Sequence, residues 1–137
     1  MLNTLLSVLC YDIWFYLSHI LLHKRLLWPL HKEHHTKEEP VWSDAYIGHW
    51  LESPFQSLGT VVPMLWIQYT WTEIGLIVAF LNLRGMMRHD ARFVWLIGNH
   101  HLLHHKYANY NYGEYWLDWL GGTLYGGNEY RQGLIYL

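Results

Sequence analysis

The sequence predicts an all-α protein, an integral-membrane helical bundle of one span plus a helical hairpin, with a histidine-rich helical cap on its cytoplasmic face. Three observations predict this fold: two long apolar stretches, basic residues that follow each stretch, and histidines at helical spacing beside them. A chain of 137 residues has room for one domain. We therefore expect a single domain over residues 1–137.

The first apolar stretch covers residues 2–22, and at about 1.5 Å per residue it just crosses a hydrocarbon core of about 30 Å. It carries one polar stripe at steps of four, three and four, made of Asp12, Tyr16, His19 and His23. A polar stripe inside a membrane normally faces a protein interior. The stretch has neither the basic start nor the small-residue cleavage site of a signal peptide. We expect a retained first span over residues 1–23.

The second apolar stretch runs from about residue 51 to residue 83 and is interrupted by polar residues at 69–73. As one helix it would be far too long for a membrane, so we expect a hairpin of two helices. Pro54 and Pro63 would bend or start its first arm. The predicted membrane hairpin covers residues 51–88.

A hairpin returns the chain to the side that it left, so the basic residues after the first span and after the hairpin share one face. These residues are Lys24, Arg25, Lys32, Lys37, Arg84, Arg88 and Arg92. The positive-inside rule makes that face cytoplasmic. Residues 24–50 and 89–137 are therefore expected to be cytosolic segments that carry histidines. Within the second, we expect a helix over 93–106, a loop over 107–113 and a short interfacial helix over 114–120.

The composition agrees with a membrane protein and excludes some partners. Nine Trp and eleven Tyr are typical of chains that meet a membrane interface. The formal charge of −2 and the few Lys and Arg residues argue against binding to nucleic acid. The lone Cys10 lies in an apolar run and is expected to be a buried, inert thiol.

Three groups of histidines carry the functional prediction. They read His19-x3-His23, His31-x2-His34-His35 and His101-x2-His104-His105, with His100 directly before the last. Residues three and four apart share a helix face, so each group is expected to aim two or three imidazoles at one point. Imidazole suits iron, zinc, copper and nickel, and eight histidines are enough for two ions. The lack of thiolates and clustered carboxylates argues against calcium, magnesium and structural zinc.

Two irons that react with dioxygen would suit such a donor set, because iron supplies one-electron steps that side chains cannot. A site at the membrane surface implies a lipid substrate that enters from the bilayer. Each metal-bound imidazole also needs an acceptor for its other N–H. Acidic candidates are Asp12, Glu33, Glu52, Asp90, Glu114 and Asp118. Asp12 stands out in its apolar surroundings, although a local cap or pair explains it equally well.

The same motifs resemble those of the fatty acid hydroxylase/sterol desaturase superfamily of integral-membrane di-iron oxygenases. The matching stretches, from about residue 8 to residue 124, are Asp12-Ile-Trp-Phe-Tyr-Leu-Ser-His19 with His23, His31-Lys-Glu-His34-His35, His100-His101-Leu-Leu-His104-His105-Lys, Asn111-Tyr112-Gly113, and Trp116-Leu-Asp118 through Gly122-Thr123. Three ordered histidine groups followed by this tail are a specific combination.

The resemblance implies a set of metal ligands, with no catalytic residues beyond them. The implied ligands are His19, His23, His31, His34, His35, His101, His104 and His105, with His89 as a further one. Some members carry another histidine four residues before His89, where this chain has Gly85; His100 is a candidate additional ligand that could compensate. Asp12, Glu52 and Asp118 are expected to support the ligands, and His49 to be structural.

For activity, the resemblance implies hydroxylation or desaturation of a lipid C–H bond, in a sterol or a fatty acyl chain or sphingolipid, with O2 and two Fe ions. Zinc could replace iron in purified protein. Electrons must come from an external donor, such as cytochrome b5 or a ferredoxin-type reductase system, because no flavin or nucleotide fingerprint is present. A eukaryotic source would place the protein in the endoplasmic reticulum.

Two alternatives stay open at this point. A membrane electron carrier with histidine-ligated haem is one, since two histidines on facing helices can hold a haem. The other is an inactive, truncated metal-binding relic, because of Gly85 and because longer members carry a further transmembrane pair before the first histidine group. Fewer helices leave less wall for a lipid tunnel, which a homo-oligomer could complete.

Overall fold

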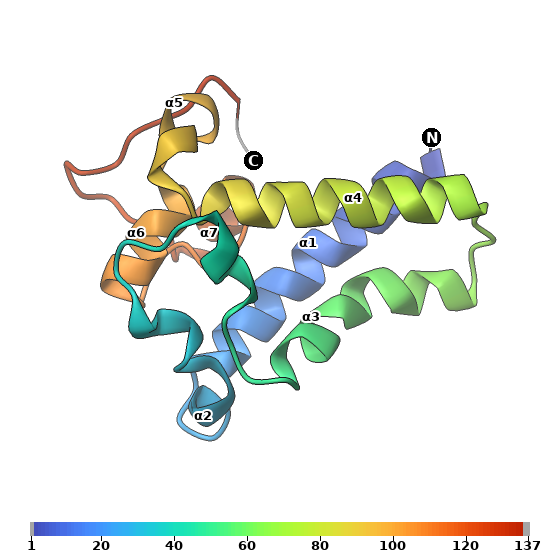
Figure 1. Cartoon of the computed structure of the whole chain (residues 1–137), viewed down its shortest axis with the longest axis horizontal. Helices are drawn as coiled ribbons and strands as arrows, with labels where there is room; N and C mark the ends of the chain where they lie inside the picture. Colours follow the sequence, from blue (N-terminus) through green and yellow to red (C-terminus); the bar gives the residue numbers. More distant parts are fainter. Residues whose placement is uncertain (1, 136–137) are drawn as a thin grey trace.

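Three long helical segments set the shape of the molecule (Figure 1). They are α1 (Leu2–Leu22), α3 (Glu52–Val61) with the 3-10 helix η3 (Val62–Leu65), and α4 (Trp71–Arg88). This computed structural model describes residues 2–135, and over that range it contains helices and no strand. The predicted all-α class is confirmed.

The shorter elements gather at the end of the molecule where α4 ends, opposite the N-terminus of α1 (Figure 1). They are α2 (Trp28–His31), η1 (His34–Thr36), η2 (Trp42–Tyr46), η4 (Ala91–Phe93), α5 (Val94–Ile97), α6 (His100–Tyr107) and α7 (Tyr115–Gly121). All the predicted histidine segments therefore lie at one end of the long helices.

The polar stripe of α1 faces the interior, as predicted. Asp12, Tyr16 and His19 are buried, whereas Leu5 and Leu9 on the same helix are exposed. On its buried side α1 packs against both α3 and α4. The approach to α3 is close at Gly59, where an added Cβ would lie 2.8 Å from the Cα of Tyr11. The Trp14 indole, whose Nε1–H donates to the Phe55 carbonyl at 2.8 Å, also joins the two helices.

The predicted hairpin is present, with its turn between η3 and α4. Thr70 caps α4: its hydroxyl accepts from the Glu73 amide at 3.2 Å, and the Glu73 carboxylate accepts from the Thr70 amide at 3.0 Å. Within residues 2–135, α1 alone is long and apolar enough to cross a membrane. α4 has 18 residues but includes Glu73, Arg84 and Arg88. That the hairpin enters a membrane stays a prediction.

The prediction of one helix over 93–106 was wrong. The chain forms η4 and α5, breaks at Gly98, and resumes as α6. Gly98 has a φ of 79°, and an added Cβ would lie 2.8 Å from the Arg131 carbonyl oxygen, so the C-terminal tail packs directly on this break. Periodicity alone does not reveal such a contact. The loop and the short helix that follow lie close to where they were predicted, and α7 ends before Gly122, whose φ is 69°.

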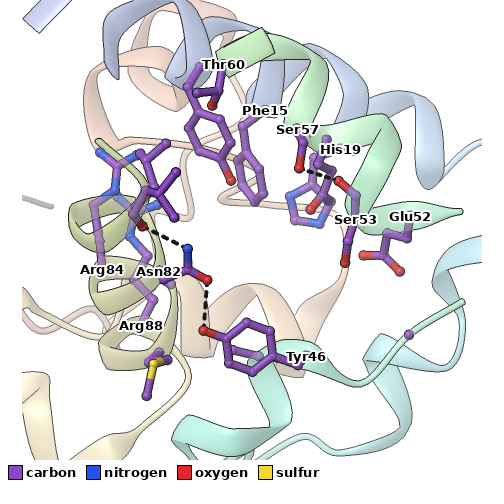
Figure 2. A pocket seen from close by; sticks show the side chains of 18 of the residues that line it. Phe15, His19, Tyr46, Glu52, Ser53, Ser57, Thr60, Asn82, Arg84 and Arg88 are labelled. Atoms are coloured by element: carbon purple, nitrogen blue, oxygen red, sulfur yellow. Dashed lines mark hydrogen bonds between the residues drawn. The ribbon is translucent and has the colours of Figure 1, made fainter. Parts of the chain in front are cut away.

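A cavity of about 490 Å³ lies between α1, α3 and α4. Figure 2 shows Phe15 and His19 from α1, Ser53, Ser57 and Thr60 from α3, and Asn82, Arg84 and Arg88 from α4 around this space. The cavity reaches the ends of these helices where the histidines lie, because His19, His34, His89 and His101 also line it.

Candidate metal centre

Nine histidines come together in two clusters. The five-histidine cluster is His19, His23, His31, His35 and His104, and the four-histidine cluster is His34, His89, His101 and His105. Within each cluster, one ring nitrogen from every histidine lies within 4.8 Å of the others. These nine are the residues that the resemblance implied as ligands. His100 and His49 lie in neither cluster.

The second and third sequence groups each send two imidazoles to one cluster, which agrees with the expectation of two or three at one point, and send the third imidazole to the other cluster. His34 and His35 are neighbours in η1, but His35 has non-helical backbone angles (φ −89°, ψ 16°), and the two side chains enter different clusters. On α6, His101 and His105 are four residues apart and share a face, while His104 belongs to the other cluster.

In the five-histidine cluster, hydrogen bonds fix the orientation of three rings. His19 donates from Nδ1 to the Tyr112 carbonyl at 2.6 Å, and His104 donates from Nδ1 to the Tyr110 carbonyl at 2.6 Å. The Nδ1 of His31 meets the Glu52 carboxylate at 2.8 Å. These acceptors leave the Nε2 atoms free to point into the cluster, as second-sphere contacts do at metal sites.

The four-histidine cluster uses backbone carbonyls in the same way. The Nδ1 atoms of His34, His89 and His105 donate to the carbonyls of Ile47, Gly85 and Lys37 at 2.9, 2.7 and 3.2 Å, respectively. A carbonyl oxygen can only accept, so each of these Nδ1 atoms carries the ring proton. In the neutral ring, Nε2 then carries a lone pair.

These lone pairs face one another at short distances. The Nε2 atoms of His19 and His31 are 2.9 Å apart, and those of His34 and His89 are also 2.9 Å apart. Two acceptors cannot hydrogen-bond each other, so a cation between them explains the contact. Nitrogen ligands about 2.1 Å from one ion lie about 3.0 Å apart at a right angle and about 3.4 Å apart in a tetrahedron. The donor set therefore fits metal ions with more than four ligand positions.

Burial keeps the imidazoles in the neutral form that binds metal. Burial, reinforced by neighbouring histidines, lowers the pKa values of His35 and His89 to about 3. Burial and nearby histidines lower the pKa values of His101 and His104 as well. At neutral pH these rings carry no proton that a metal ion must displace. The Nε2 of His105 is buried without a hydrogen-bond partner among the described residues, which also fits a metal ligand.

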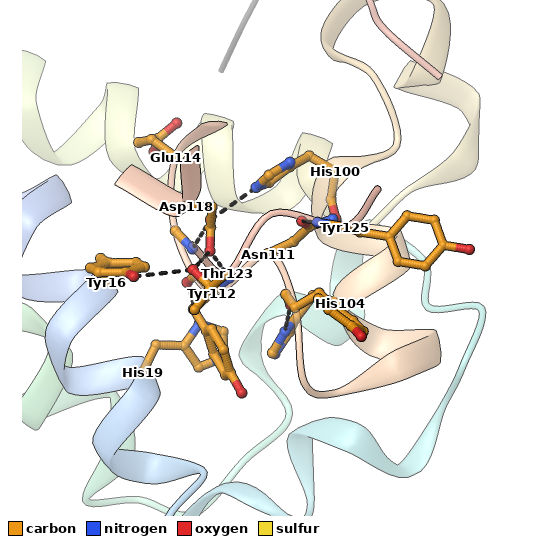
Figure 3. A network of polar contacts seen from close by, with 12 residues as sticks. Tyr16, His19, His100, His104, Asn111, Tyr112, Glu114, Asp118, Thr123 and Tyr125 are labelled. Atoms are coloured by element: carbon orange, nitrogen blue, oxygen red, sulfur yellow. Dashed lines mark hydrogen bonds and ion pairs between the residues drawn. The ribbon is translucent and has the colours of Figure 1, made fainter. Parts of the chain in front are cut away.

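Asp118 organises the loop beside the centre (Figure 3). Its carboxylate accepts from the amides of Tyr112 and Gly113 at 2.8 Å and from the Thr123 hydroxyl at 2.6 Å. It also meets the Nε2 of His100 at 3.0 Å, so this nitrogen of His100 points away from both clusters. Asp118 therefore acts on His19 indirectly, by fixing the loop that carries the Tyr112 carbonyl.

Asp12 lies in a buried ion-pair network and not beside an imidazole. Arg84 donates to Asp12 and, at 3.1 Å, to Glu114, while Arg88 donates to Glu114. From the sequence, both arginines were interpreted as basic residues that set the orientation in the membrane, and their buried ion pairs were not predicted. Their spacing of four residues in an apolar helix was the available signal. Of the acidic candidates, Glu52 alone accepts from a histidine of the two clusters among the described residues; the other acceptors are backbone carbonyls.

Nine histidines in two clusters give this helical protein a donor set that could bind metal ions. Comparisons with known proteins define its class further. The sequence profile named Fatty acid hydroxylase matches residues 4–123. The chain belongs to the fatty acid hydroxylase family.

The names of individual relatives refer to sterols. A Delta(7)-sterol 5(6)-desaturase of Aspergillus fumigatus is 32% identical over 131 residues, 86% of this chain and 36% of that protein. The lathosterol oxidase of Homo sapiens is 29% identical over 125 residues, 82% of this chain and 42% of that protein. A Delta(7)-sterol 5(6)-desaturase of Schizosaccharomyces pombe is 32% identical over 120 residues, 80% of this chain and 39% of that protein. The chain thus spans about two fifths of these relatives, and no solved structure matches it significantly.

Proposed function

We propose that this chain forms the di-iron part of a membrane oxygenase that hydroxylates or desaturates a C–H bond of a lipid, with a sterol as the favoured substrate class. The observation that carries the proposal is the pair of histidine clusters at the wall of a cavity between the long helices. Membership of the fatty acid hydroxylase family and the names of the relatives support it.

Nine histidines would hold the metal, five around one ion and four around the other. Iron, when bound, supplies the one-electron chemistry with dioxygen that side chains lack. The protein orients the ligands: Tyr112, Tyr110 and Glu52 hold the rings of the five-histidine cluster, and Ile47, Gly85 and Lys37 hold those of the other. Burial of these rings excludes bulk water from the ligand nitrogens.

The cavity suits a largely apolar substrate that carries a polar group. Tyr11, Phe15, Ile74, Val78 and Leu81 supply apolar wall on α1 and α4. On α3 most lining residues are polar, and four of them recur at helical spacing: Ser53, Gln56, Ser57 and Thr60. This polar stripe could orient a hydroxyl group, while the apolar wall holds the carbon skeleton that is oxidised.

The outer surface supports placement in a membrane. Exposed apolar residues cover α1, η3 and α4, among them Leu5, Leu9, Leu65, Leu76 and Leu83. Contiguous apolar surface of this kind marks a membrane or protein contact. We propose a histidine site on the cytoplasmic face, in the endoplasmic reticulum of a eukaryote. Electrons would come from an external donor such as cytochrome b5 or a ferredoxin-type system.

The arrangement of the histidines does not favour the haem carrier. A haem takes two axial ligands from opposite sides of one flat ring. Here four or five imidazoles converge on each cluster, so the rings beyond any axial pair occupy the plane that a porphyrin would fill.

Metal content and turnover test the proposal together. Detergent-purified protein should contain close to two irons per chain by elemental analysis. With a Δ7 sterol, O2 and a reductant, it should yield an oxidised sterol by mass spectrometry. Replacing His104 and His105 with alanine should remove iron and product, whereas His49→Ala, outside both clusters, should retain both. Unchanged product from the double variant, or a wild-type chain that holds no metal, would contradict the proposal.

A further inference from the structure

The two histidine clusters do not meet the cavity equally. Three of the four histidines in the four-histidine cluster line it: His34, His89 and His101. Of the five-histidine cluster, His19 alone is among the lining residues. The cavity therefore opens mainly onto the four-histidine cluster.

The side of His89 that faces the cavity has open space at Gly85. Residues 85 and 89 are one helical turn apart and share a face of α4. Gly85 lines the cavity, and a Cβ added to it would meet nothing within 4 Å. Its carbonyl orients the His89 ring. In Figure 2, Arg84 and Arg88 mark this stretch of α4 at the edge of the cavity.

The donor count is unequal as well. Five imidazoles converge in one cluster and four in the other, although the nitrogen spacing in both fits ions with more than four positions. The four-histidine cluster thus has one donor fewer, and it adjoins the open space beside Gly85.

From these observations we propose that the ion in the four-histidine cluster keeps an open coordination position, which faces the cavity beside Gly85 and accepts a small external ligand. The ion in the five-histidine cluster is closed to such ligands. The ligand class is a small neutral or anionic molecule with a lone pair, because a metal cation attracts such a donor and repels a cation. This inference rests on the proposed metal binding and assigns different tasks to the two ions.

Azide binding to the iron-loaded, oxidised protein tests the inference without turnover. After elemental analysis has established two irons per chain, azide is titrated and its charge-transfer absorbance is recorded. Wild-type protein should bind one azide per two irons. Gly85→His should place an imidazole in the open position and weaken azide binding at least tenfold, with two irons retained.

Gly75→His is the matched control, because Gly75 lies on the same helix with equally open surroundings but does not line the cavity. It should bind azide as the wild type does. Two irons with no azide bound in the wild type would overturn the open position and leave the metal proposal standing. Wild-type azide affinity in Gly85→His, or equal weakening in Gly75→His, would overturn the assignment to Gly85.

Two neighbouring histidines give a second measurement if Gly85→His does not fold. His34→Ala removes a ligand of the four-histidine cluster, and His35→Ala removes one of the five-histidine cluster. Each variant should keep close to one iron per chain. Azide binding should be lost in His34→Ala and retained in His35→Ala. The reverse pattern, or azide binding in both, would place the open position elsewhere.

Discussion

The two ends of the molecule are built from opposite kinds of contact. The long-helix end, formed by α1, α3, η3 and α4, exposes Leu5, Leu9, Leu65 and Leu76 on its outer surface. The histidine end comprises α2, α6, α7, their connections and the adjoining turns of α1 and α4. It buries His31, His104, Asn111 and Asp118 almost completely, while its apolar cluster consists of Tyr16, Tyr112 and Leu117.

The difference shows what stabilises each end. Apolar surface contributes by leaving water, so a membrane or another apolar partner is needed to stabilise the outside of the long-helix end. The histidine end also buries apolar residues, among them Leu22, Ile97 and Leu103, but its buried polar residues are more numerous. Buried polar groups stabilise a fold only when they are satisfied. Hydrogen bonds, and the metal ions proposed above, therefore stabilise this end. Four predictions test that division, from the largest expected effect to the smallest.

Removing the metal should increase local unfolding at the histidine end and not at the long-helix end. Without cations the converging lone pairs of the clusters lose their partner, and structural zinc sites contribute on the order of 10 kcal/mol to folding. Hydrogen exchange of the amides in α6 and in residues 108–114 should accelerate more than tenfold after chelation. Exchange in residues 3–15 of α1 should change little. The control sample receives chelator that is already saturated with metal. If chelation accelerated hydrogen exchange equally at both ends, the metal would not stabilise the histidine end selectively.

Arg84→Met should remove the ion pairs that connect the two ends and lower the free energy of unfolding. Arg84 connects Asp12 of α1 with Glu114 of the loop before α7, and its loss leaves two buried carboxylates short of a partner. Breaking a buried ion pair costs about 3–5 kcal/mol. Denaturant unfolding in detergent measures the loss. The control is Arg92→Met, since the Arg92 side chain is 70% exposed and its pair with Asp90 contributes at most about 1 kcal/mol. Similar losses in both variants would show that the network is not structural.

Leu9→Lys should weaken membrane insertion of α1 and leave the histidine end intact. A lysine at the centre of a spanning helix costs about 2.5–3.5 kcal/mol of insertion free energy. Insertion is measured in microsomes, and metal content in the purified protein should not change. Leu26→Lys, at a more exposed residue beyond the end of α1, serves as the control. Wild-type insertion of the Leu9 variant would argue that this face meets a protein and not a bilayer.

Tyr16→Phe should have the smallest effect. The Tyr16 hydroxyl lies 3.0 Å from the Thr123 hydroxyl, and Thr123 keeps its hydrogen bond to Asp118 when Tyr16 changes. One neutral hydrogen bond contributes about 0.5–1.5 kcal/mol. The same unfolding measurement should detect this difference, with Tyr46→Phe at an exposed hydrogen bond as the smaller control. A loss as large as that of Arg84→Met would mean that Tyr16 does more than tie α1 to the loop.

The features that sequence predicted well are local. The inward stripe of α1 follows from the spacing of Asp12, Tyr16 and His19, and the hairpin turn follows from the polar residues before Trp71. α7 ends at Gly121, one residue beyond the predicted end at residue 120. Each of these features depends on a few neighbouring residues, so periodicity and turn chemistry are sufficient.

The features that sequence missed depend on contacts between distant segments. The break at Gly98 is shaped by the tail near Arg131, and the division of His34 and His35 between clusters depends on a 3-10 turn. The ion pairs of Arg84 and Arg88 join three separate segments. Eight of the nine clustered histidines were predictable from their spacing, and His89 from the family resemblance, whereas their assignment to one cluster or the other was not predicted.

The hydrogen-bond acceptors that orient the histidines also determine which positions around this centre can accept substitutions. Five of the six rings with an oriented Nδ1 use main-chain carbonyls, those of residues 37, 47, 85, 110 and 112. A carbonyl remains whatever side chain the residue carries, so substitutions at these positions can keep the ring orientation. Glu52 is the exception, because its carboxylate is the acceptor. In an alignment of relatives, we expect position 52 to vary as little as the histidines, while several of the carbonyl positions change freely.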